Sequence, residues 1–208
     1  LQVLQSKDLS GNLFLKATHD QVLKVLRQAD YLRQKYHVVV ANPPYMGSKG
    51  MNGKLSDYAK KEYPDSKTDL FAIFIERGFQ LIFKLGYSAM VTMQSWMFLS
   101  SYEKLRGKLL SNSSVVSMAH MDNMVMGIAF GTSATVWTKH PNEQRLGGYC
   151  YIHYKDLGDN NVPIEFPPSN IRNSGKGAKN NLFWISSNDF GKIPGSTLSY
   201  WSSEQIKD

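Results

Sequence analysis

The stretch that decides the fold reads His37-Val38-Val39-Val40-Ala41-Asn42-Pro43-Pro44-Tyr45, a short β-branched run that ends abruptly in two prolines. The apolar run at residues 37–41 is continuous rather than alternating, which predicts a strand buried on both faces of a parallel sheet. The prolines end this strand because neither can donate a hydrogen bond to a neighbouring strand. The polar end of the motif is therefore expected at the carboxyl end of a parallel strand, where open α/β sheets bind ligands.

Helical and strand patterns alternate on both sides of this motif. Apolar residues recur at helical spacing upstream, in residues 19–36, and again in residues 70–85, where Gly86 is the expected C-terminal stop. Further strands are expected at residues 87–93, 115–118 and 134–138, with one more strand suggested at residues 149–154. This alternation predicts an open α/β sheet whose final pair of strands is antiparallel.

The composition limits the classes of protein to which the chain can belong. Of its 208 residues 42% are hydrophobic, enough to bury a core, and the net charge of +7 weakly favours a polyanionic partner. A single cysteine, Cys150, excludes an internal disulfide framework, and five scattered histidines give no metal-ligand spacing, so no metal is predicted. No apolar stretch approaches the roughly 20 residues of a membrane span, so we expect a cytoplasmic protein without a membrane partner.

The residues at the strand end suit chemistry on an exocyclic amine. An amine conjugated to an aromatic ring is a poor nucleophile because its lone pair is delocalised into that ring. The carboxamide oxygen of Asn42 and the carbonyl of Pro43 can both accept hydrogen bonds from such an amine, which frees the lone pair, and the prolines hold these acceptors rigidly. Tyr45 offers a flat face on which a base can stack. The alternative is that the four residues form only a strand-ending turn.

The motif V-V-V-A-N-P-P-Y resembles motif IV of the adenine-N6 DNA methyltransferases that use S-adenosylmethionine. Three later segments are also similar to that family, and together the resemblance covers about residues 10–140: Asp69-Leu70-Phe71-Ala72, Leu85-Gly86-Tyr87 and Phe130-Gly131-Thr132. Within the family the sequence most resembles the large methyltransferases of BREX phage-defence systems, of the PglX type, and the methylase part of type II restriction enzymes.

The resemblance implies a Rossmann-like methyltransferase sheet and assigns roles to individual residues. It implies S-adenosylmethionine as co-substrate, double-stranded DNA with a flipped-out adenine as substrate, and partner subunits of a defence system. It also implies four sets of site residues: Asn42, Pro43, Pro44 and Tyr45 for catalysis, Tyr45 and Phe130 for the base pocket, Leu70 and Phe74 for the cofactor, and Lys49, Lys54, Lys60 and Lys61 for the DNA backbone. The alternatives are a core role for Leu70, Phe74 and Phe130, and a solvated surface for the lysines.

The sequence departs from the family in its first part. Residues 1–36 contain one glycine, Gly11, and no F-x-G-x-G pattern that could cradle the cofactor, and Asp8 and Asp20 lack the strand context of a ribose ligand. Residues 1–140 are therefore expected to form the C-terminal half of a catalytic domain with its last four strands, residues 141–181 a loop-rich connection, and residues 182–208 the start of a target-recognition domain. Such a fragment is expected to bind the cofactor weakly, to be inactive alone, and to self-associate through the exposed edge of its first strand.

Other readings stay open at this point. The same four-residue motif occurs in methyltransferases that act on protein glutamine or RNA guanine, although the aromatic-rich stretch after residue 180 favours a longer enzyme. A non-catalytic DNA-binding module would fit the charge but would leave the motif unexplained. A cytosine-C5 mechanism needs a thiolate nucleophile, and Cys150 follows no proline and ends no predicted strand, which argues against it.

Overall fold

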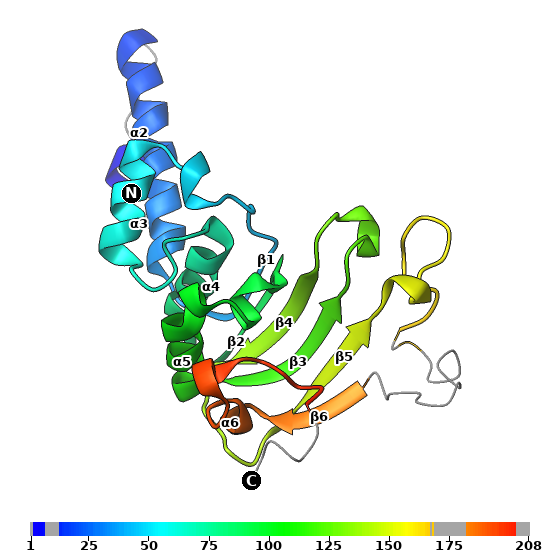
Figure 1. Ribbon diagram of the computed structural model, residues 1–208. Coiled ribbons are helices and arrows are strands. Elements are labelled where there is room, and N and C mark those ends of the chain that lie inside the picture. Colours follow the sequence, from blue (N-terminus) through cyan, green and yellow to red (C-terminus); the bar gives the residue numbers. More distant parts are fainter. Residues whose placement is uncertain (1, 7–12, 167, 169–181, 203–208) are drawn as a thin grey trace. The chain divides into compact units, whose positions relative to one another are not determined.

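The protein is described by a computed structural model that covers residues 2–6, 13–166, 168 and 182–202 (Figure 1). The chain divides into two compact units, Leu1–Tyr36 and His37–Asp208. Asp8 and Gly11 lie outside the described residues, as does the whole 169–181 part of the expected loop-rich connection.

The first unit is helical, as its apolar periodicity predicts. It contains α1 (Gln2–Gln5) and α2 (Leu13–Arg33). The apolar side chains of α2 are not buried, since Val22 is 43% exposed and Val25 is 61% exposed. This helix therefore presents an apolar stripe at its surface.

The second unit is built on one mixed sheet of six strands in the order β1-β2-β4-β3-β5-β6. The strands are β1 (Tyr36–Ala41), β2 (Ile82–Met93), β3 (Ser114–Met121), β4 (Thr132–Thr138), β5 (Leu146–Ile152) and β6 (Leu182–Ser186). Strand β4 runs antiparallel to both β2 and β3, which confirms the expected antiparallel pair. Strand β5 is parallel to β3 and antiparallel to β6, so the sheet extends beyond the four expected strands.

Strand β1 lies at the edge of the sheet, and the prediction that it is buried on both faces is wrong. Val38 and Val40 are 55% and 75% exposed, whereas Val39 and Ala41 pack against the main core. The physical reason is that β1 has one neighbouring strand, β2, and that the core covers only one face of the sheet there. A continuous apolar run in the sequence therefore does not distinguish a strand that is packed on both faces from one that is packed on a single face.

Helices of the second unit gather on one face of the sheet (Figure 1). Phe71 and Ile75 of α4, Leu105 of α5 and Phe190 of α6 share one buried cluster with strand residues such as Trp137. The helices are α3 (Gly53–Glu62), α4 (Leu70–Leu81), α5 (Glu103–Asn112) and α6 (Ser187–Phe190), and the short 3-10 turns are η1 (Ser48–Gly50), η2 (Gln94–Met97), η3 (Ser100–Tyr102), η4 (Val125–Gly127), η5 (Tyr154–Asp156) and η7 (Pro194–Ser196).

The helix expected to run to residue 85 ends earlier, at Leu81, and β2 begins at Ile82. The ammonium group of Lys139 donates to the carbonyl of Phe79 at 2.6 Å and so satisfies one of the last carbonyls of α4. Gly86 is not a helix stop: it lies inside β2, where a Cβ atom would stand 2.9 Å from the carbonyl oxygen of His37. The glycine is required by the close approach of β1 to β2 rather than by a helix end.

The C-terminal stretch belongs to the same sheet and core. Sequence reasoning assigned residues 182–208 to a further domain, but β6 pairs with β5, and Leu198 and Tyr200 are buried in the main cluster. Arg106, 1% exposed, fastens this stretch, because its guanidinium donates to the carbonyl of Gly195 at 2.7 and 2.9 Å and to those of Trp96 and Leu99 at 2.9 and 2.7 Å. The pattern of turns and aromatic residues did not reveal β6.

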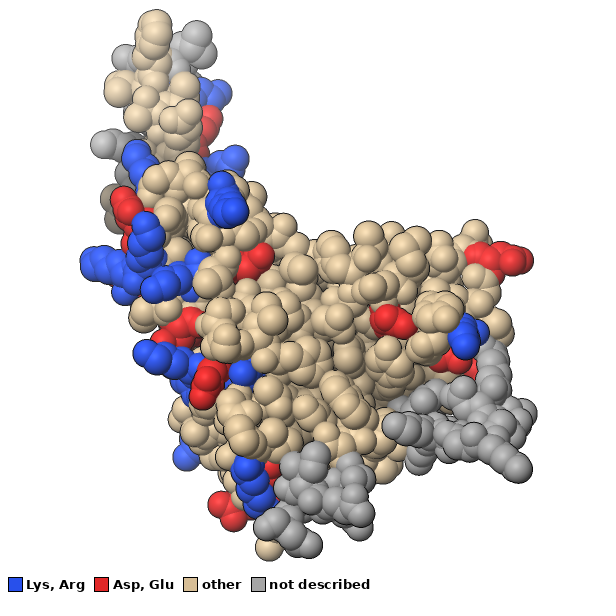
Figure 2. Space-filling view, in the orientation of Figure 1, with Lys and Arg blue, Asp and Glu red and all other residues tan. Residues whose placement is uncertain are grey.

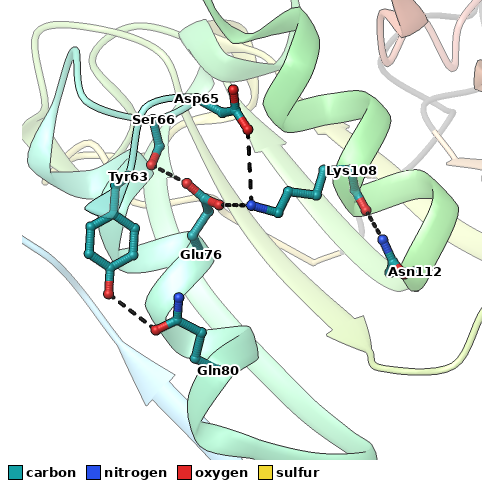
Figure 3. Close-up of polar contacts among 7 residues, drawn as sticks. All are labelled: Tyr63, Asp65, Ser66, Glu76, Gln80, Lys108 and Asn112. Atoms are coloured by element: carbon teal, nitrogen blue, oxygen red, sulfur yellow. Dashed lines mark hydrogen bonds and ion pairs between the residues drawn. The ribbon is translucent and has the colours of Figure 1, made fainter. Parts of the chain in front are cut away.

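A buried carboxylate connects α4 with α5 and with the loop before α4 (Figure 3). Glu76 accepts from the hydroxyl of Ser66 and from the ammonium of Lys108, both at 2.5 Å. Lys108 also lies 4.0 Å from the carboxylate of Asp65. Because the partners come from three segments, this group fixes the position of the α3–α4 loop relative to α5.

On the opposite face of the sheet a smaller cluster of Met121, Val125, Cys150 and Ile152 is buried, and beside it the described residues leave an apolar groove. The groove, of about 460 Å³, is lined by small side chains of the central strands, among them Ala89, Ala119, Ala134 and Gly148. Trp184 and Phe166 stand beside it and are 62% and 63% exposed. Within the described residues no helix is both long and apolar enough to cross a membrane.

Candidate active site

The Asn42–Tyr45 motif lies where β1 ends, at an edge of the sheet shared with the ends of other strands. The start of β1 lies beside Gly86 near the start of β2, and the Tyr45 hydroxyl reaches the carbonyl of Val91 near the end of β2, so the two strands run in the same direction. Since β2 and β3 are both antiparallel to β4, the carboxyl ends of β1, β2 and β3 meet at this edge. This is the edge on which open α/β sheets place their ligands.

Within the motif, the side chains of Asn42 and Tyr45 contact each other. The Tyr45 hydroxyl lies 3.3 Å from the carboxamide oxygen of Asn42 and 3.3 Å from the carbonyl oxygen of Val91, so its single proton is shared between two acceptors. Asn42 is exposed and Pro43 is buried, which leaves the carboxamide open to a ligand while the backbone behind it is packed. The Asn42 oxygen has a second lone pair with which it can accept from an amine.

Tyr45 forms the centre of an aromatic group. Its ring meets Phe130 at 5.6 Å between centroids and 69° between planes, and Phe71 at 6.2 Å and 86°. The structure thus brings together two residues that are 85 positions apart in the sequence and were both assigned to a base pocket. Phe130 remains 37% exposed, and partial burial raises the pKa of Tyr45, so the hydroxyl stays protonated at neutral pH.

The loop after the motif is tied to the start of α4 by Asp69, a residue to which sequence reasoning gave no role. The Asp69 carboxylate accepts from the backbone N–H of Met46 at 3.0 Å and of Phe71 at 3.2 Å, and it caps α4. The N–H of Leu70 also donates to the Met46 carbonyl at 3.0 Å. Burial raises the pKa of Asp69, and the hydrogen bonds from these backbone groups oppose that rise. The signal in the sequence was an aspartate immediately before an apolar helical run.

The two residues assigned to the cofactor differ in their surroundings. Phe74 is 39% exposed on α4, while its neighbours Phe71 and Ile75 are buried, so its ring is accessible to a planar ligand. Leu70 is half-buried and packs against the α3 cluster of Ala59, Tyr63 and Ile73. Of the two residues, Phe74 is the one whose side chain is open to a ligand.

The four lysines assigned to DNA are all exposed, on or just before α3. Lys60 lies 4.0 Å from Asp57 and Lys61 lies 3.3 Å from Glu62, whereas Lys49 and Lys54 form no ion pair with the part of the chain that the structure describes. Figure 2 shows Lys and Arg side chains gathered over the region of α3.

The surroundings of Cys150 disfavour a reactive thiolate. Cys150 is buried in β5, and burial, followed by the charge of Asp156, raises its pKa to about 11, so the thiol is not a thiolate at neutral pH. Among the described residues there is no group of three or more His, Cys, Asp or Glu side chains arranged to hold a metal ion.

Comparison with known proteins matches this chain to one family. The model of the Eco57I restriction-modification methylase matches residues 5–125. The adenine-specific methyltransferase BrxX of Escherichia coli O9:H4 (strain HS) is 42% identical over 205 residues, which are 98% of this chain and 16% of that protein. The adenine-specific methyltransferase PglX of Lacticaseibacillus casei (strain Zhang) is 32% identical over 187 residues, 89% of this chain and 15% of that protein.

A solved structure supports the fold. The type I restriction-modification methyltransferase subunit from Streptococcus thermophilus aligns with a TM-score of 0.52 and 16% identity, over 81% of this chain and 38% of that one. At this identity the likeness concerns the fold alone. The chain spans about 16% of the length of the curated relative that it matches over almost its whole extent.

Proposed function

Because the chain belongs to the Eco57I restriction-modification methylase family, we propose that it forms the target-base part of a site-specific adenine-N6 DNA methyltransferase of a restriction-modification or phage-defence system. The observation that carries this proposal is the exposed Asn42 carboxamide next to the hydroxyl of Tyr45, whose ring in turn meets Phe130. An acceptor next to two aromatic faces suits a flipped-out base with an exocyclic amine.

In this proposal Asn42 and Pro43 act on the amine through their oxygens. The Asn42 carboxamide oxygen and the Pro43 carbonyl each accept a hydrogen bond from the N6 amino group, which draws its lone pair out of conjugation with the ring. Pro44 keeps the backbone rigid, so both oxygens are oriented before the substrate arrives. Tyr45 and Phe130 hold the base by stacking, worth roughly 1–3 kcal/mol per base in proteins that bind single strands. S-adenosylmethionine, when bound, supplies the methyl group.

The remaining site residues would bind the cofactor and the DNA backbone. Phe74 and, at its edge, Leu70 are proposed to wall the adenine end of S-adenosylmethionine. Lys49, Lys54, Lys60 and Lys61 are proposed to contact phosphates beside the base pocket, and the absence of ion pairs with described residues at the first two supports them as the stronger contacts.

The function belongs to a protein longer than these residues. The relatives BrxX and PglX extend far beyond the matched part, and residues 1–36 contain no glycine-rich cofactor loop. We therefore propose that such a loop and a target-recognition region lie elsewhere in the complete protein, which would act on double-stranded DNA in the cytoplasm, alone or with partner subunits. The 208-residue chain by itself is expected to bind the cofactor weakly and not to methylate DNA.

The proposal is tested in the complete protein with the substitution Asn42→Ala. The protein is produced in a host that lacks adenine methylation, and genomic N6-methyladenine is mapped by sequencing. We expect methylation at one recurring sequence with the wild-type protein and none with N42A, because the amine loses its acceptor. In calorimetry, the Kd of N42A for the cofactor should lie within about twofold of the wild-type Kd. This is well below a tenfold change in Kd, which would correspond to about 1.4 kcal/mol. If the genome of the host that produces the wild-type protein contains no N6-methyladenine, the proposal is overturned.

A further inference from the structure

A chain of three buried or half-buried polar side chains connects the C-terminal stretch with the proposed base pocket. Gln94 follows the end of β2, His120 lies at the end of β3, and Tyr200 lies beyond η7. The Nε2 atom of His120 is 2.5 Å from the carboxamide oxygen of Gln94, and the Nδ1 atom is 2.7 Å from the hydroxyl of Tyr200. These three residues are called the His120 network below.

The hydrogen-bond partners define the tautomer of His120 in the structure. The Gln94 carboxamide oxygen faces Nε2, so Nε2 carries the hydrogen of that bond. Nδ1 of a neutral imidazole is then an acceptor, and the Tyr200 hydroxyl, which can donate or accept, donates to it. Burial lowers the pKa of His120 to about 4 in spite of the charge of Asp122, so the imidazole is neutral at physiological pH.

The ring of His120 is also held by aromatic contacts. Trp201 stacks on it at 6.1 Å and 27°, and Phe98 and Tyr151 lie at 6.0 and 5.1 Å. His120 and Tyr200 are only 5% and 1% exposed. With both of its nitrogens and its ring held in place, His120 presents Gln94 with a donor at one fixed position.

Gln94 in turn holds the segment that carries Phe130. Its backbone N–H donates to the carbonyl of Gly131 at 3.0 Å. Its carboxamide lies against the Cα of Gly131, so that a Cβ atom at this position would overlap it. The residue before this glycine is Phe130, whose ring meets Tyr45 at 5.6 Å. The Gln94 side chain thus packs against the glycine that directly follows Phe130.

We propose that Gln94, His120 and Tyr200 are positioning residues of the target-base pocket, which set the place of Phe130 relative to Tyr45. This inference rests on the proposed function and deepens it, since it makes the C-terminal stretch part of the device that receives the base. None of the three touches the reacting atoms. They determine how well the flipped base is held next to Asn42. They therefore affect kcat for methylation more than the affinity for the DNA duplex.

The test uses Tyr200→Phe in the complete protein, with Tyr149→Phe as the matched control. Both changes remove one buried hydroxyl, and the two rings stack on each other at 5.2 Å and 17°, but only Tyr200 bonds His120. The DNA is an oligonucleotide that carries the methylated sequence, with 2-aminopurine in place of the target adenine for the binding measurement. Fluorescence of this probe reports whether the base has left the stack and how it is held in the pocket.

We expect Y200F to lower kcat about tenfold, the effect of losing one neutral hydrogen bond, with KM for DNA changed by less than about twofold. The 2-aminopurine signal should change in Y200F and stay at the wild-type value in Y149F. Gly131→Ala, which displaces the Gln94 carboxamide directly, should lower kcat similarly, and the double variant should lose little more than either single one because both act through Gln94.

Different results would overturn the proposed function and the positioning role. Wild-type protein that does not methylate DNA would overturn the proposed function and the positioning role with it. Wild-type protein that methylates DNA, with kcat and probe signal of Y200F equal to those of Y149F, would overturn only the positioning role. Equal melting temperatures of Y200F and Y149F, measured alongside, separate positioning from a general loss of stability.

Discussion

Single side chains rather than whole elements decide how the proposed site is held. Asp69 shows this most directly, because one carboxylate caps α4 and binds the backbone of Met46, the residue that follows Tyr45. The same carboxylate therefore stabilises the helix and limits the motion of the motif. An N-cap aspartate was visible in the sequence, but its second hydrogen bond was not, because that bond spans 23 residues.

Asp69→Ala should destabilise the protein and loosen the motif together. The lost N-cap costs about 1 kcal/mol of the free energy of unfolding, and the Met46 N–H loses its acceptor as well. Asn52→Ala is the control, since Asn52 caps α3 through Leu55 at 2.9 Å without contacting the motif. Hydrogen exchange at Met46 should accelerate in D69A and not in N52A. Equal exchange in the two variants would contradict a tether through Asp69.

At the scale of elements, the order of helices and strands was predictable, but their ends and their exposure were not. The positions of β1 to β4 and the antiparallel β3–β4 pair follow from periodicity and turn residues. The end of α4 could not be predicted in this way, because apolar residues continue past Leu81. Only the pairing of β2 with its neighbours decides where the helix ends. Strand β6 was missed since its partner, β5, is more than 30 positions away.

The candidate site also contains residues that could be predicted from the sequence and residues that could not. Asn42 to Tyr45 could be found from sequence because their chemistry lies in adjacent residues. The contact of Tyr45 with Phe130, and the links from Gln94 through His120 to Tyr200, depend on which strand ends meet at one edge of the sheet. No local pattern in the sequence marks Gln94 or His120, since a polar residue at a strand end is common.

A pair of glycine substitutions tests the close approach of β1 to β2. Gly86→Ala should lower the free energy of unfolding by roughly 1–3 kcal/mol, because the new Cβ meets the His37 carbonyl and forces β1 away from β2. Gly107→Ala, in α5 with open space around it, should instead raise stability by about 0.5–1 kcal/mol. Chemical denaturation of both variants measures these changes. A neutral G86A would mean that the two strands are not closely packed there.

At the scale of the whole molecule, the main feature of the second unit is a sheet whose helices cover one face, while the described residues leave an apolar groove on the other. The open groove of about 460 Å³ and the exposed edge of β1 both lie on apolar surface. Monomeric proteins rarely expose apolar surface of this kind without a partner for it. The much greater length of the relatives is consistent with a cover supplied by other parts of a complete protein.

The 208-residue chain by itself should self-associate through the edge of β1. Val40→Lys places a charge on this edge and should shift the chain toward the monomer, as lysines do on natural edge strands. Val162→Lys is the control, because Val162 is exposed in a loop outside the named strands. Sedimentation velocity at several concentrations measures the outcome. A chain that stays monomeric at all concentrations, with β1 amides protected from hydrogen exchange, would contradict this prediction.

The exposed edge of β1 also bears on how the chain should refold in solution. Val38 and Val40 are 55% and 75% exposed on the last strand at one side of the sheet. Unpaired strand edges template pairing between copies during folding, so the yield of refolded 208-residue chain should fall as the protein concentration rises.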